Sequence, residues 1–400
     1  MKVLQINAVN GIKSTGRSTI ELADYLVKNG HESYIAYSEG MKNRNSYKVG
    51  FKVEKKIHAM LNRITGKQGY YSTYSTKKLI KKIKKINPDI IHLRNLHGNF
   101  INIELLMNFI IEHKKKVVIT LHDCWFYTGK CTHYTLDNCY KWKNSCGSCP
   151  RLRKDIPSLI FDKTTTMLND KQYWFQNIEK LGVIGVSDWI TEEAKASILS
   201  EARIIERIYN GIDLKKFYPQ DSGEFRNNNN FGNKFLILGV ASQWTSEKGL
   251  NKFIELSNFL SENQIIILIG NIDNNQYLPK NIINIKETHE TNLLAEIYSS
   301  ADLFLNLSME ETFGKTTAES LACGTPAIVY NSTASPELIG DRCGEILESE
   351  DITELMEKID IIKNKGKAFY TNHCRNFAST NFDKEKNNEK YIELYKELIG

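Results

Sequence analysis

Short apolar runs alternate with longer segments of mixed polarity along the whole chain. In the first half, the runs that predict β-strands are Val3–Ile6, Ser33–Ala36, Asp89–Leu93, Val117–Thr120 and Val183–Val186. In the second half they are Phe235–Val240, Ile265–Ile269, Ile282–Ile285, Leu303–Leu307 and Ala327–Val329. Helix-length segments fit between them, for example Ser18–Asn29, Lys248–Glu262 and Glu290–Ser299. This alternation is typical of βα units, so we expect an α/β fold with parallel sheets.

The strand–helix rhythm stops once and restarts, which predicts two doubly wound, Rossmann-like domains in the 400 residues. The polar segment Asp221–Asn233 lies at the break. We expect an N-terminal domain over residues 1–215, a C-terminal domain over 216–380 and a helix within 381–400 that packs back on the first domain. Because open α/β sheets bind ligands at the carboxyl ends of their strands, a cleft between the domains would hold the site.

The charge of the chain is small overall but unevenly placed. A formal net charge of +6 does not indicate a nucleic-acid partner. Lysines cluster at helical spacing with apolar residues between them, at Lys77, Lys78, Lys81, Lys82, Lys84 and Lys85. This cluster is either a solvated helix face or a surface attracted to anionic lipid or to a phosphate-bearing acceptor.

The sequence shows neither a signal peptide nor a run of the ~20 apolar residues that a membrane span needs. We therefore expect a cytoplasmic protein whose membrane contact, if any, is peripheral and at the inner face of the membrane.

Two glutamates flank the expected start of a helix. Glu311 lies in the loop after the strand Leu303–Leu307, and Glu319 lies inside a helix that should begin near Lys315. Gly314 would allow a ligand to approach the backbone closely. The first N–H groups of the helix favour an anion such as a diphosphate. Two carboxylates at this point suit the paired hydroxyl groups of a ribose and a hexose, although acidic residues near a helix start also stabilise the helix dipole.

Motifs spread over nearly the whole chain fit one family. They are Glu311-x7-Glu319 with Phe313-Gly314 between, Ala322-x-Gly324-Thr325-Pro326, Tyr209-Asn210-Gly211-Ile212-Asp213, Lys248-Gly249 and His122-Asp123. Together they resemble the retaining GT-B glycosyltransferases of the large family 4 type, which includes bacterial capsule, lipopolysaccharide and colanic-acid sugar transferases.

The resemblance implies a role for each matching position. Glu319 would hold the ribose hydroxyls, and Glu311 would contact the donor hexose. Lys248 would neutralise the leaving diphosphate, and His122 would lie near the donor sugar and the acceptor. The remaining implied donor contacts are Gly16, Arg17, Gln243, Phe313, Gly314, Lys315 and Thr316.

One of these positions departs from the family pattern. The family usually has an arginine five residues before the lysine, where this chain has Gln243 followed by Trp244. A charge partner of the diphosphate is therefore absent or supplied elsewhere, for example by Arg17.

The implied reaction is a retaining hexosyl transfer in cell-envelope polysaccharide synthesis. The partners would be a UDP- or GDP-sugar donor, whose base is expected to be read near Ile285–His289, and a glycan or undecaprenyl-linked acceptor. The transition state would be oxocarbenium-like, and the resemblance implies no metal for this step.

Two other functions stay open. One is a related GT-B enzyme that epimerises a nucleotide sugar at C2. The other is a nucleotide-binding module, because Gly11-Ile-Lys-Ser-Thr-Gly16-Arg17-Ser18 nearly matches the phosphate-binding pattern Gly-x4-Gly-Lys-Ser/Thr. Arg17 replaces the compact lysine that this loop needs, which weakens the match.

Five of the eight cysteines lie in an insertion over residues 124–149. Cys146-x2-Cys149 has the spacing of a zinc knuckle, and Cys131 and Cys139 could complete four thiolates. Separate buried or reactive thiols are the alternative. Similar cysteine-rich insertions occur in a subgroup of the family that the chain resembles, which favours a structural zinc.

Overall fold

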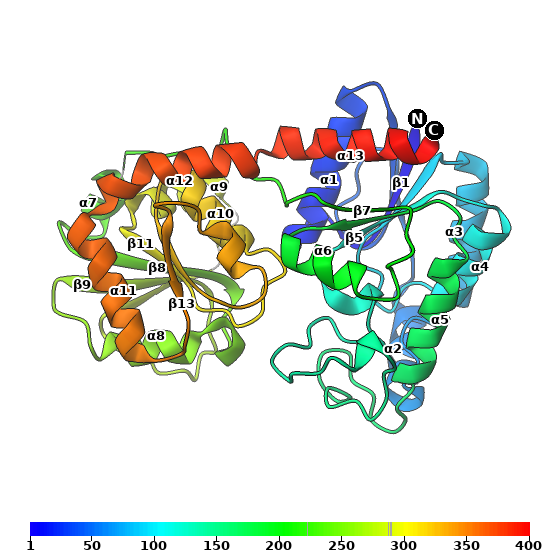
Figure 1. Ribbon diagram of the computed structural model, residues 1–400, viewed down its shortest axis with the longest axis horizontal. Helices are drawn as coiled ribbons and strands as arrows, with labels where there is room; N and C mark the ends of the chain where they lie inside the picture. Colours follow the sequence, from blue (N-terminus) through cyan, green and yellow to red (C-terminus); the bar gives the residue numbers. More distant parts are fainter. Residues whose placement is uncertain (222, 287, 289) are drawn as a thin grey trace. The chain divides into compact units, whose positions relative to one another are not determined.

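The computed structural model describes residues 1–221, 223–286, 288 and 290–400. Ser222, in the expected boundary segment, and Glu287 and His289, in the segment expected to read the donor base, lie outside the described residues. The chain forms two compact units (Figure 1), the first from Met1–Ile208 with Asn388–Gly400 and the second from Tyr209–Asn387. The division thus falls at 208/209 and 387/388, compared with the expected 215/216 and 380/381.

The first unit is built on a seven-stranded parallel sheet with strand order β3-β2-β1-β4-β5-β6-β7. Its strands are β1 (Lys2–Asn10), β2 (Glu32–Gly40), β3 (Ser46–Lys48), β4 (Ile90–Leu93), β5 (Val117–Leu121), β6 (Leu181–Gly185) and β7 (Ile204–Arg207). Its helices are α1 (Lys13–Lys28), α2 (Lys52–Thr65), α3 (Thr73–Ile86), α4 (Ile103–Glu112), α5 (Thr164–Gln176), α6 (Asp188–Lys195) and most of α13 (Lys384–Ile399). Short 3-10 turns lie at Cys124–Phe126 and Lys141–Lys143.

Apolar residues of α1 and α13 form one core with the sheet. Leu26 of α1 and Tyr395 and Leu398 of α13 are buried together with Val3 of β1. The polar ring of His92 in β4 is also buried there, and its Nδ1 lies 2.7 Å from the Tyr395 hydroxyl. The other ring nitrogen of His92 lies 2.7 Å from the Thr120 hydroxyl, so both nitrogens of this buried ring have partners. The amphipathic pattern of the last helix is explained by its docking here.

The second unit carries a six-stranded parallel sheet with strand order β10-β9-β8-β11-β12-β13. Its strands are β8 (Phe235–Gln243), β9 (Gln264–Asn271), β10 (Ile282–Ile285), β11 (Leu303–Asn306), β12 (Ala327–Tyr330) and β13 (Gly344–Leu347). Its helices are α7 (Gly223–Asn228), α8 (Leu250–Ser257), α9 (Thr291–Ser300), α10 (Lys315–Ala322), α11 (Ile352–Lys365) and α12 (Lys367–Asn381), with 3-10 turns at Ser246–Lys248 and Ser335–Leu338. Helices α8 and α11 pack together, whereas α9, α10 and α12 form the other layer (Figure 1).

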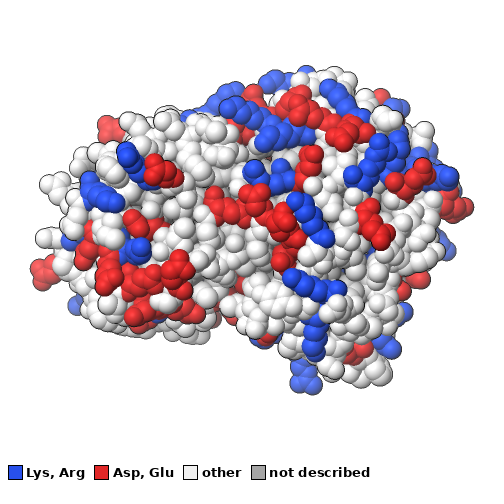
Figure 2. Space-filling view, in the orientation of Figure 1, with Lys and Arg blue, Asp and Glu red and all other residues white. Residues whose placement is uncertain are grey.

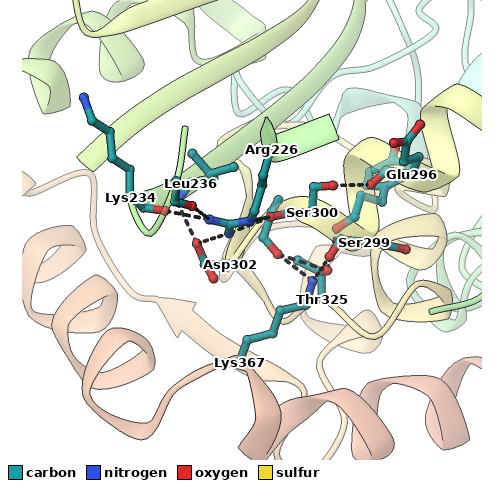
Figure 3. Close-up of polar contacts among 12 residues, drawn as sticks. Arg226, Lys234, Leu236, Glu296, Ser299, Ser300, Asp302, Thr325 and Lys367 are labelled. Atoms are coloured by element: carbon teal, nitrogen blue, oxygen red, sulfur yellow. Dashed lines mark hydrogen bonds and ion pairs between the residues drawn. The ribbon is translucent and has the colours of Figure 1, made fainter. Parts of the chain in front are cut away.

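A polar network fixes the end of α9 and the beginning of β11 (Figure 3). The Arg226 guanidinium donates to the Ser300 carbonyl at 2.7 Å and pairs with Asp302 at 2.7 Å. Lys367 donates to the Ala301 carbonyl at 2.7 Å, and burial lowers its pKa to about 8. Asp302 also accepts from the Leu236 N–H of β8 at 2.8 Å. The network lies at the amino-terminal edge of the sheet, opposite the edge where ligands bind, so it is structural.

Every strand that the hydrophobic runs predicted is present, and both sheets are parallel as expected. The strands β3, β7 and β13 were not predicted, because they are short edge strands with many half-exposed positions. The first helix begins at Lys13 rather than near Ser18. The segment predicted as one helix from Lys248 is a 3-10 turn followed by α8, because Gly249 has a left-handed φ of 83°.

Among the residues that the structure describes, none of the helices combines the length and the apolar character needed to cross a bilayer.

Candidate functional site

The loop that leaves β11 brings Glu311 to Lys248. The Lys248 Nζ lies 2.7 Å from Oε1 of Glu311 and donates to the Ser308 hydroxyl at 3.2 Å. Lys248 follows the carboxyl end of β8, and Ser308 and Glu311 follow the carboxyl end of β11. These strands are neighbours in the sheet, so their following loops meet at one edge. The Lys248 side chain remains 41% exposed, which leaves the ammonium open to a ligand.

The position of Glu311 is set by the loop that follows β12. The Glu311 N–H donates to the Thr333 hydroxyl at 2.9 Å, and the Ala334 N–H donates to the Glu311 carbonyl at 3.2 Å. The Ser332 hydroxyl also donates to the Met309 carbonyl at 2.7 Å. Backbone on both sides of Glu311 is therefore held before any ligand binds, which is the preorganisation that electrostatic catalysis requires.

Gly314 gives α10 an open N-terminus. Its φ is 87°, in the left-handed region, and an added Cβ would lie 2.9 Å from the Leu338 Cδ1. A side chain at this position would thus be strained and crowded. The N–H groups of Lys315 and Thr316 belong to the first helical turn, where an α-helix supplies no acceptor. This turn can bind an anion such as a phosphate group.

Glu319 is buried within α10 and lies near Tyr298 of α9. The Tyr298 hydroxyl donates to Oε2 of Glu319 at 3.3 Å. Burial raises the pKa of Tyr298 well above its ordinary value, and the nearby carboxylate raises it further. Tyr298 therefore stays a hydrogen-bond donor and holds Glu319 in place. Neighbouring Phe313 is 2% exposed and packs against Tyr209 and Phe382, so it supports the loop through its ring.

The departure at Gln243 has a structural counterpart. Gln243 is exposed at the end of β8 and pairs with Asn271 across the sheet. Trp244 turns inward, is buried against Phe253, and donates from Nε1 to the Ile269 carbonyl at 3.0 Å. The Gln243–Trp244 segment therefore supplies an anchored turn before Lys248 and no positive charge.

In the first unit, His122 is held by a buried arginine. Arg94 Nη2 lies 2.8 Å and Arg94 Nε 3.2 Å from Nε2 of His122. Arg94 also donates to Gln5 at 3.0 Å and to the Ser18 hydroxyl at 2.7 Å. Because the guanidinium donates toward Nε2, this nitrogen is the acceptor and the proton of a neutral ring lies on Nδ1.

His97 and Asp123 form an ion pair that sequence reasoning missed. His97 Nε2 lies 2.8 Å from Oδ2 of Asp123, which also accepts from Asn95 at 3.1 Å. Burial disfavours the charged form of both groups, but the charge and the hydrogen bond of the partner together have the larger effect on each pKa. Asp123 therefore raises the pKa of His97, and His97 lowers the pKa of Asp123. The adjacency of β4 and β5 could have revealed the pair, because Arg94–His97 and His122–Asp123 follow neighbouring parallel strands.

The glycine motif of the first loop lies within a helix. Since α1 begins at Lys13, Gly16 and Arg17 belong to its first turns and not to a loop. Gly16 is buried, and an added Cβ would lie 3.1 Å from the Gly11 nitrogen. Gly16 is therefore a close-packing position, whereas Arg17 is exposed. A phosphate-binding loop would need these residues in an extended cradle ahead of the helix.

The four cysteines nominated for a metal line one small cavity. Cys131, Cys139, Cys146 and Cys149 surround a cavity of about 20 Å³, together with Tyr134 and Trp142. Interaction between the Cys131 and Cys149 thiols raises the pKa of Cys131 and lowers that of Cys149 to about 7. Within the described ranges, no three His, Cys, Asp or Glu side chains already stand in a geometry that could hold a metal ion.

Two buried lysines also organise this insertion. Lys130 donates to the carbonyls of Leu152 and Ile156, each at 2.7 Å. Lys171 donates to the Thr128 carbonyl at 2.9 Å, and burial lowers its pKa to about 7. The cysteine loops therefore have organising contacts that do not involve sulfur.

Comparison with known protein families assigns both halves of the chain. The description "Glycosyltransferase Family 4" matches residues 15–216, and "Glycosyl transferases group 1" matches residues 221–380. WcaC of Escherichia coli K12, whose name places it in colanic acid biosynthesis, is 22% identical over 374 residues, covering 89% of this chain and 90% of WcaC.

Solved structures share the fold at low identity. Sucrose-phosphate synthase from Thermosynechococcus elongatus superposes with a TM-score of 0.72 at 14% identity, over 99% of this chain and 98% of that one. Anabaena HepE in complex with UDP gives 0.69 at 15% identity, over 99% and 100%. These likenesses establish the architecture as the GT-B fold with two parallel α/β units.

Proposed function

The chain belongs to glycosyltransferase family 4, and from this premise we propose that it moves a hexose from a nucleoside-diphosphate sugar to a glycan or lipid-linked acceptor with retention of anomeric configuration. The observation that carries the proposal is the Lys248–Glu311 pair, which lies after neighbouring strands and close to the open start of α10 in the chain. WcaC supports a role in cell-envelope polysaccharide synthesis through its name.

The proposed reaction develops opposite charges on the sugar and on the leaving diphosphate. Departure of the diphosphate leaves an oxocarbenium-like sugar and a growing negative charge on the phosphate oxygens. We assign stabilisation of that negative charge to the Lys248 ammonium and to the N–H groups of Lys315 and Thr316. Glu311 would accept hydrogen bonds from the hexose hydroxyls, and Glu319 from the ribose. Neutralisation of Lys248 by Glu311 keeps the ammonium in place until a donor phosphate competes for it.

The donor is proposed to be a UDP- or GDP-sugar. HepE was solved with UDP, which supports a uridine donor for a chain of the same fold. A thermal-shift comparison of UDP, GDP and their sugars would identify the base, because a ligand that binds the folded state raises the melting temperature.

On the acceptor side, we propose that His122 contacts the reacting sugar. Arg94 fixes its imidazole ring, and the adjacent His97–Asp123 pair fixes the loop that follows β5. A neutral ring with a proton on Nδ1 could donate one hydrogen bond to a carbonyl or hydroxyl group of a substrate.

The test is transfer of a labelled sugar by the purified protein, with proton NMR of the anomeric centre in the first product. Retention together with loss of turnover in Glu311→Ala and Glu319→Ala is expected. An inverted product would overturn the retaining assignment, and unchanged turnover in both variants would overturn the site.

A 2-epimerase is the second candidate for the same donor pocket. It needs no acceptor, so incubation with a UDP-sugar alone separates the two functions: a C2 epimer favours the epimerase, and recovered substrate favours transfer. The nucleotide-triphosphate module loses its support, because Gly16 and Arg17 lie within α1.

We also propose that Cys131, Cys139, Cys146 and Cys149 hold a structural zinc ion. Thiolates are preferred zinc ligands, and a cavity of about 20 Å³ has room for one small occupant. The thiols would need to rotate toward this cavity, since their present positions pair Cys131 with Cys149. The ion would crosslink the insertion and would take no part in the transfer.

A further inference from the structure

Helix α2 of the first unit turns an apolar stripe toward solvent. Val53, Ile57, Met60 and Ile64 are 41–62% exposed. Their spacing of four, three and four residues places them on one side of a helix with 3.6 residues per turn. A helix that packs on a globular core normally buries such a stripe, so this one is directed to an environment outside the unit.

The inward side of α2 is polar, and its contacts fix the orientation of the helix. His58 is fully buried; its Nδ1 lies 2.7 Å from the Ser72 hydroxyl, and its Nε2 accepts from the Gly69 N–H at 3.2 Å. Glu54 accepts the N–H groups of Tyr74 at 3.0 Å and of Ser75 at 3.3 Å. Rolling the helix to bury the stripe would break these bonds and leave buried polar groups unpaired. The outward stripe is thus a built feature of the fold.

The exposed apolar surface extends beyond both ends of α2. At the start, Phe51 contacts Tyr74 with ring centroids 6.0 Å apart, and both rings are at least half exposed. At the end, Leu159, Ile160 and Phe161 are 53–60% exposed. The Leu159 N–H donates to the Arg63 carbonyl at 2.7 Å, which ties this loop to the last turn of α2. We call the stripe together with Phe51, Tyr74 and residues 159–161 the α2 patch.

Cations border the α2 patch. Lys52, Lys56 and Arg63 are exposed and share the helix face next to the stripe, because they are spaced four and seven residues apart. The Lys78 ammonium lies 5.7 Å from the Tyr74 ring, so the lysine-rich α3 begins at the patch. A stripe of apolar side chains flanked by lysine and arginine is typical of helices that lie in the interface of a bilayer.

The two units have opposite charge balances. Lys and Arg outnumber Asp and Glu by fourteen in the first unit, whereas Asp and Glu outnumber them by eight in the second, which together leave the net charge of +6. Figure 2 shows acidic side chains gathered on the second unit over the region of α8 and α11. An anionic surface would therefore attract the first unit and repel the second.

We propose that the α2 patch docks on an anionic phospholipid bilayer, with the apolar side chains in the headgroup–acyl boundary and the bordering cations at lipid phosphates. A bilayer fits better than a protein partner because the cations run along the stripe without acidic side chains on the same helix face. The proposal deepens the proposed function, since a lipid-linked acceptor is presented at such a surface, but docking itself needs no sugar transfer.

The test is co-sedimentation of the full chain with vesicles of phosphatidylcholine, with and without about one third phosphatidylglycerol. We expect binding that requires the anionic lipid and falls with salt. The triple variant Ile57→Ser, Met60→Ser, Phe161→Ser should lower the partition coefficient about tenfold or more, because each side chain loses apolar burial. These residues are exposed, so folding should be preserved. Phe259→Ser with Tyr277→Ser, at exposed sites in the second unit, is the matched control and should bind as the parent does.

Unchanged vesicle binding in the triple variant would overturn the proposal. So would a dimer in sedimentation velocity that dissociates in that variant, because the occupant would then be a second copy. Donor turnover on a soluble acceptor is measured in parallel. Turnover without vesicle binding would overturn docking of the α2 patch but not the proposed sugar transfer. Vesicle binding without turnover would overturn the proposed transfer but not the docking.

Discussion

The Nζ of Lys248 lies 2.7 Å from Oε1 of Glu311, although 63 positions separate the two residues in the chain. Gly249 makes this approach possible. Its φ is 83°, and an added Cβ would lie 2.6 Å from the Leu307 carbonyl oxygen, so backbone from the β8 side packs directly on the loop that leaves β11. The pair joins the two loops that the proposed transfer needs.

Lys248→Met should remove the positive charge while keeping much of the side-chain volume. We expect kcat to fall about 10²–10³-fold, the cost of losing one preorganised group that stabilises developing charge. Lys248→Arg, which keeps the charge in a different geometry, should recover part of the rate. Steady-state kinetics with a labelled donor measure both. A kcat for Lys248→Met within a factor of about two of the parent value would mean that Lys248 takes no part in the reaction.

Glu319→Gln should act on nucleotide binding more than on the chemical step. The carboxylate is buried, hydrogen bonded to Tyr298 and assigned to the ribose. Loss of charge-assisted bonds to ribose hydroxyls should raise the Kd for the free nucleoside diphosphate about tenfold. Glu311→Gln, assigned to the hexose, should leave that Kd unchanged and lower kcat. Calorimetry with the nucleoside diphosphate separates the two roles, and equal weakening by both variants would contradict them.

The sequence predicts the buried strands because each is a continuous apolar run, as in β5 and β11. It predicts Glu311 and Glu319 because a motif of fixed spacing surrounds them. It does not reveal the outward stripe of α2, because the stripe has the same periodicity as a buried one. Only the contacts of His58 and Glu54 show which side of that helix faces inward.

The long-range polar pairs could not be found without knowing which strands are neighbours in the sheet. His97 has no motif around it, and Arg94 looks like an ordinary charged residue after a strand. Arg94 is nevertheless 2% exposed and bonds His122, Gln5 and Ser18, which come from three other segments. Such a network depends on strand order, and strand order is not encoded in any local pattern.

Removal of the proposed zinc should loosen the insertion without abolishing the fold. We expect about one zinc per chain in protein prepared under reducing conditions, and loss of that metal in Cys146→Ser with Cys149→Ser. Protease nicking within residues 131–149 should then increase. Cys323→Ser, at a buried thiol in the second unit, is the control and should keep the metal. Elemental analysis that finds no zinc in the parent protein would contradict the proposal.

The His97–Asp123 pair should contribute stability over a defined pH range. The folded pKa of His97 is above its ordinary 6.5, so its contribution is complete below about 6.5 and is lost as the pH rises through the folded value. The folded pKa of Asp123 is below 3.8, so its contribution is present above about 4 and is lost in acid.

The difference in unfolding free energy between the parent and His97→Gln should therefore be largest between about pH 4 and 6.5 and should shrink toward pH 9. A double-mutant cycle with Asp123→Asn isolates the pair from the cost of leaving one buried partner alone. A coupling energy that stays constant from pH 5 to 9 would mean that pairing with Asp123 does not raise the pKa of His97.

His58 should make the anchoring of α2 sensitive to mild acid. Burial lowers its pKa from 6.5 to about 4, and its Nε2 can accept from Gly69 only while that nitrogen is unprotonated. In the unfolded chain the ring takes up a proton below about pH 6.5, whereas in the folded chain it does so only near pH 4. The neutral ring therefore stabilises the fold above about 6.5, and this stability is lost progressively as the pH falls to about 4, by up to about 3 kcal/mol.

Urea unfolding at pH 7.5 and 5.0, followed by tryptophan fluorescence, measures this loss, because four of the five tryptophans lie in the first unit. Other groups titrate in the same range, so the comparison is with His58→Gln, which keeps polar atoms at the site but does not titrate. The parent should lose more stability between these two pH values than the variant does. Equal losses would mean that His58 is not held neutral. The hydrogen bond from Gly69 would then not help to keep the apolar stripe of α2 facing outward.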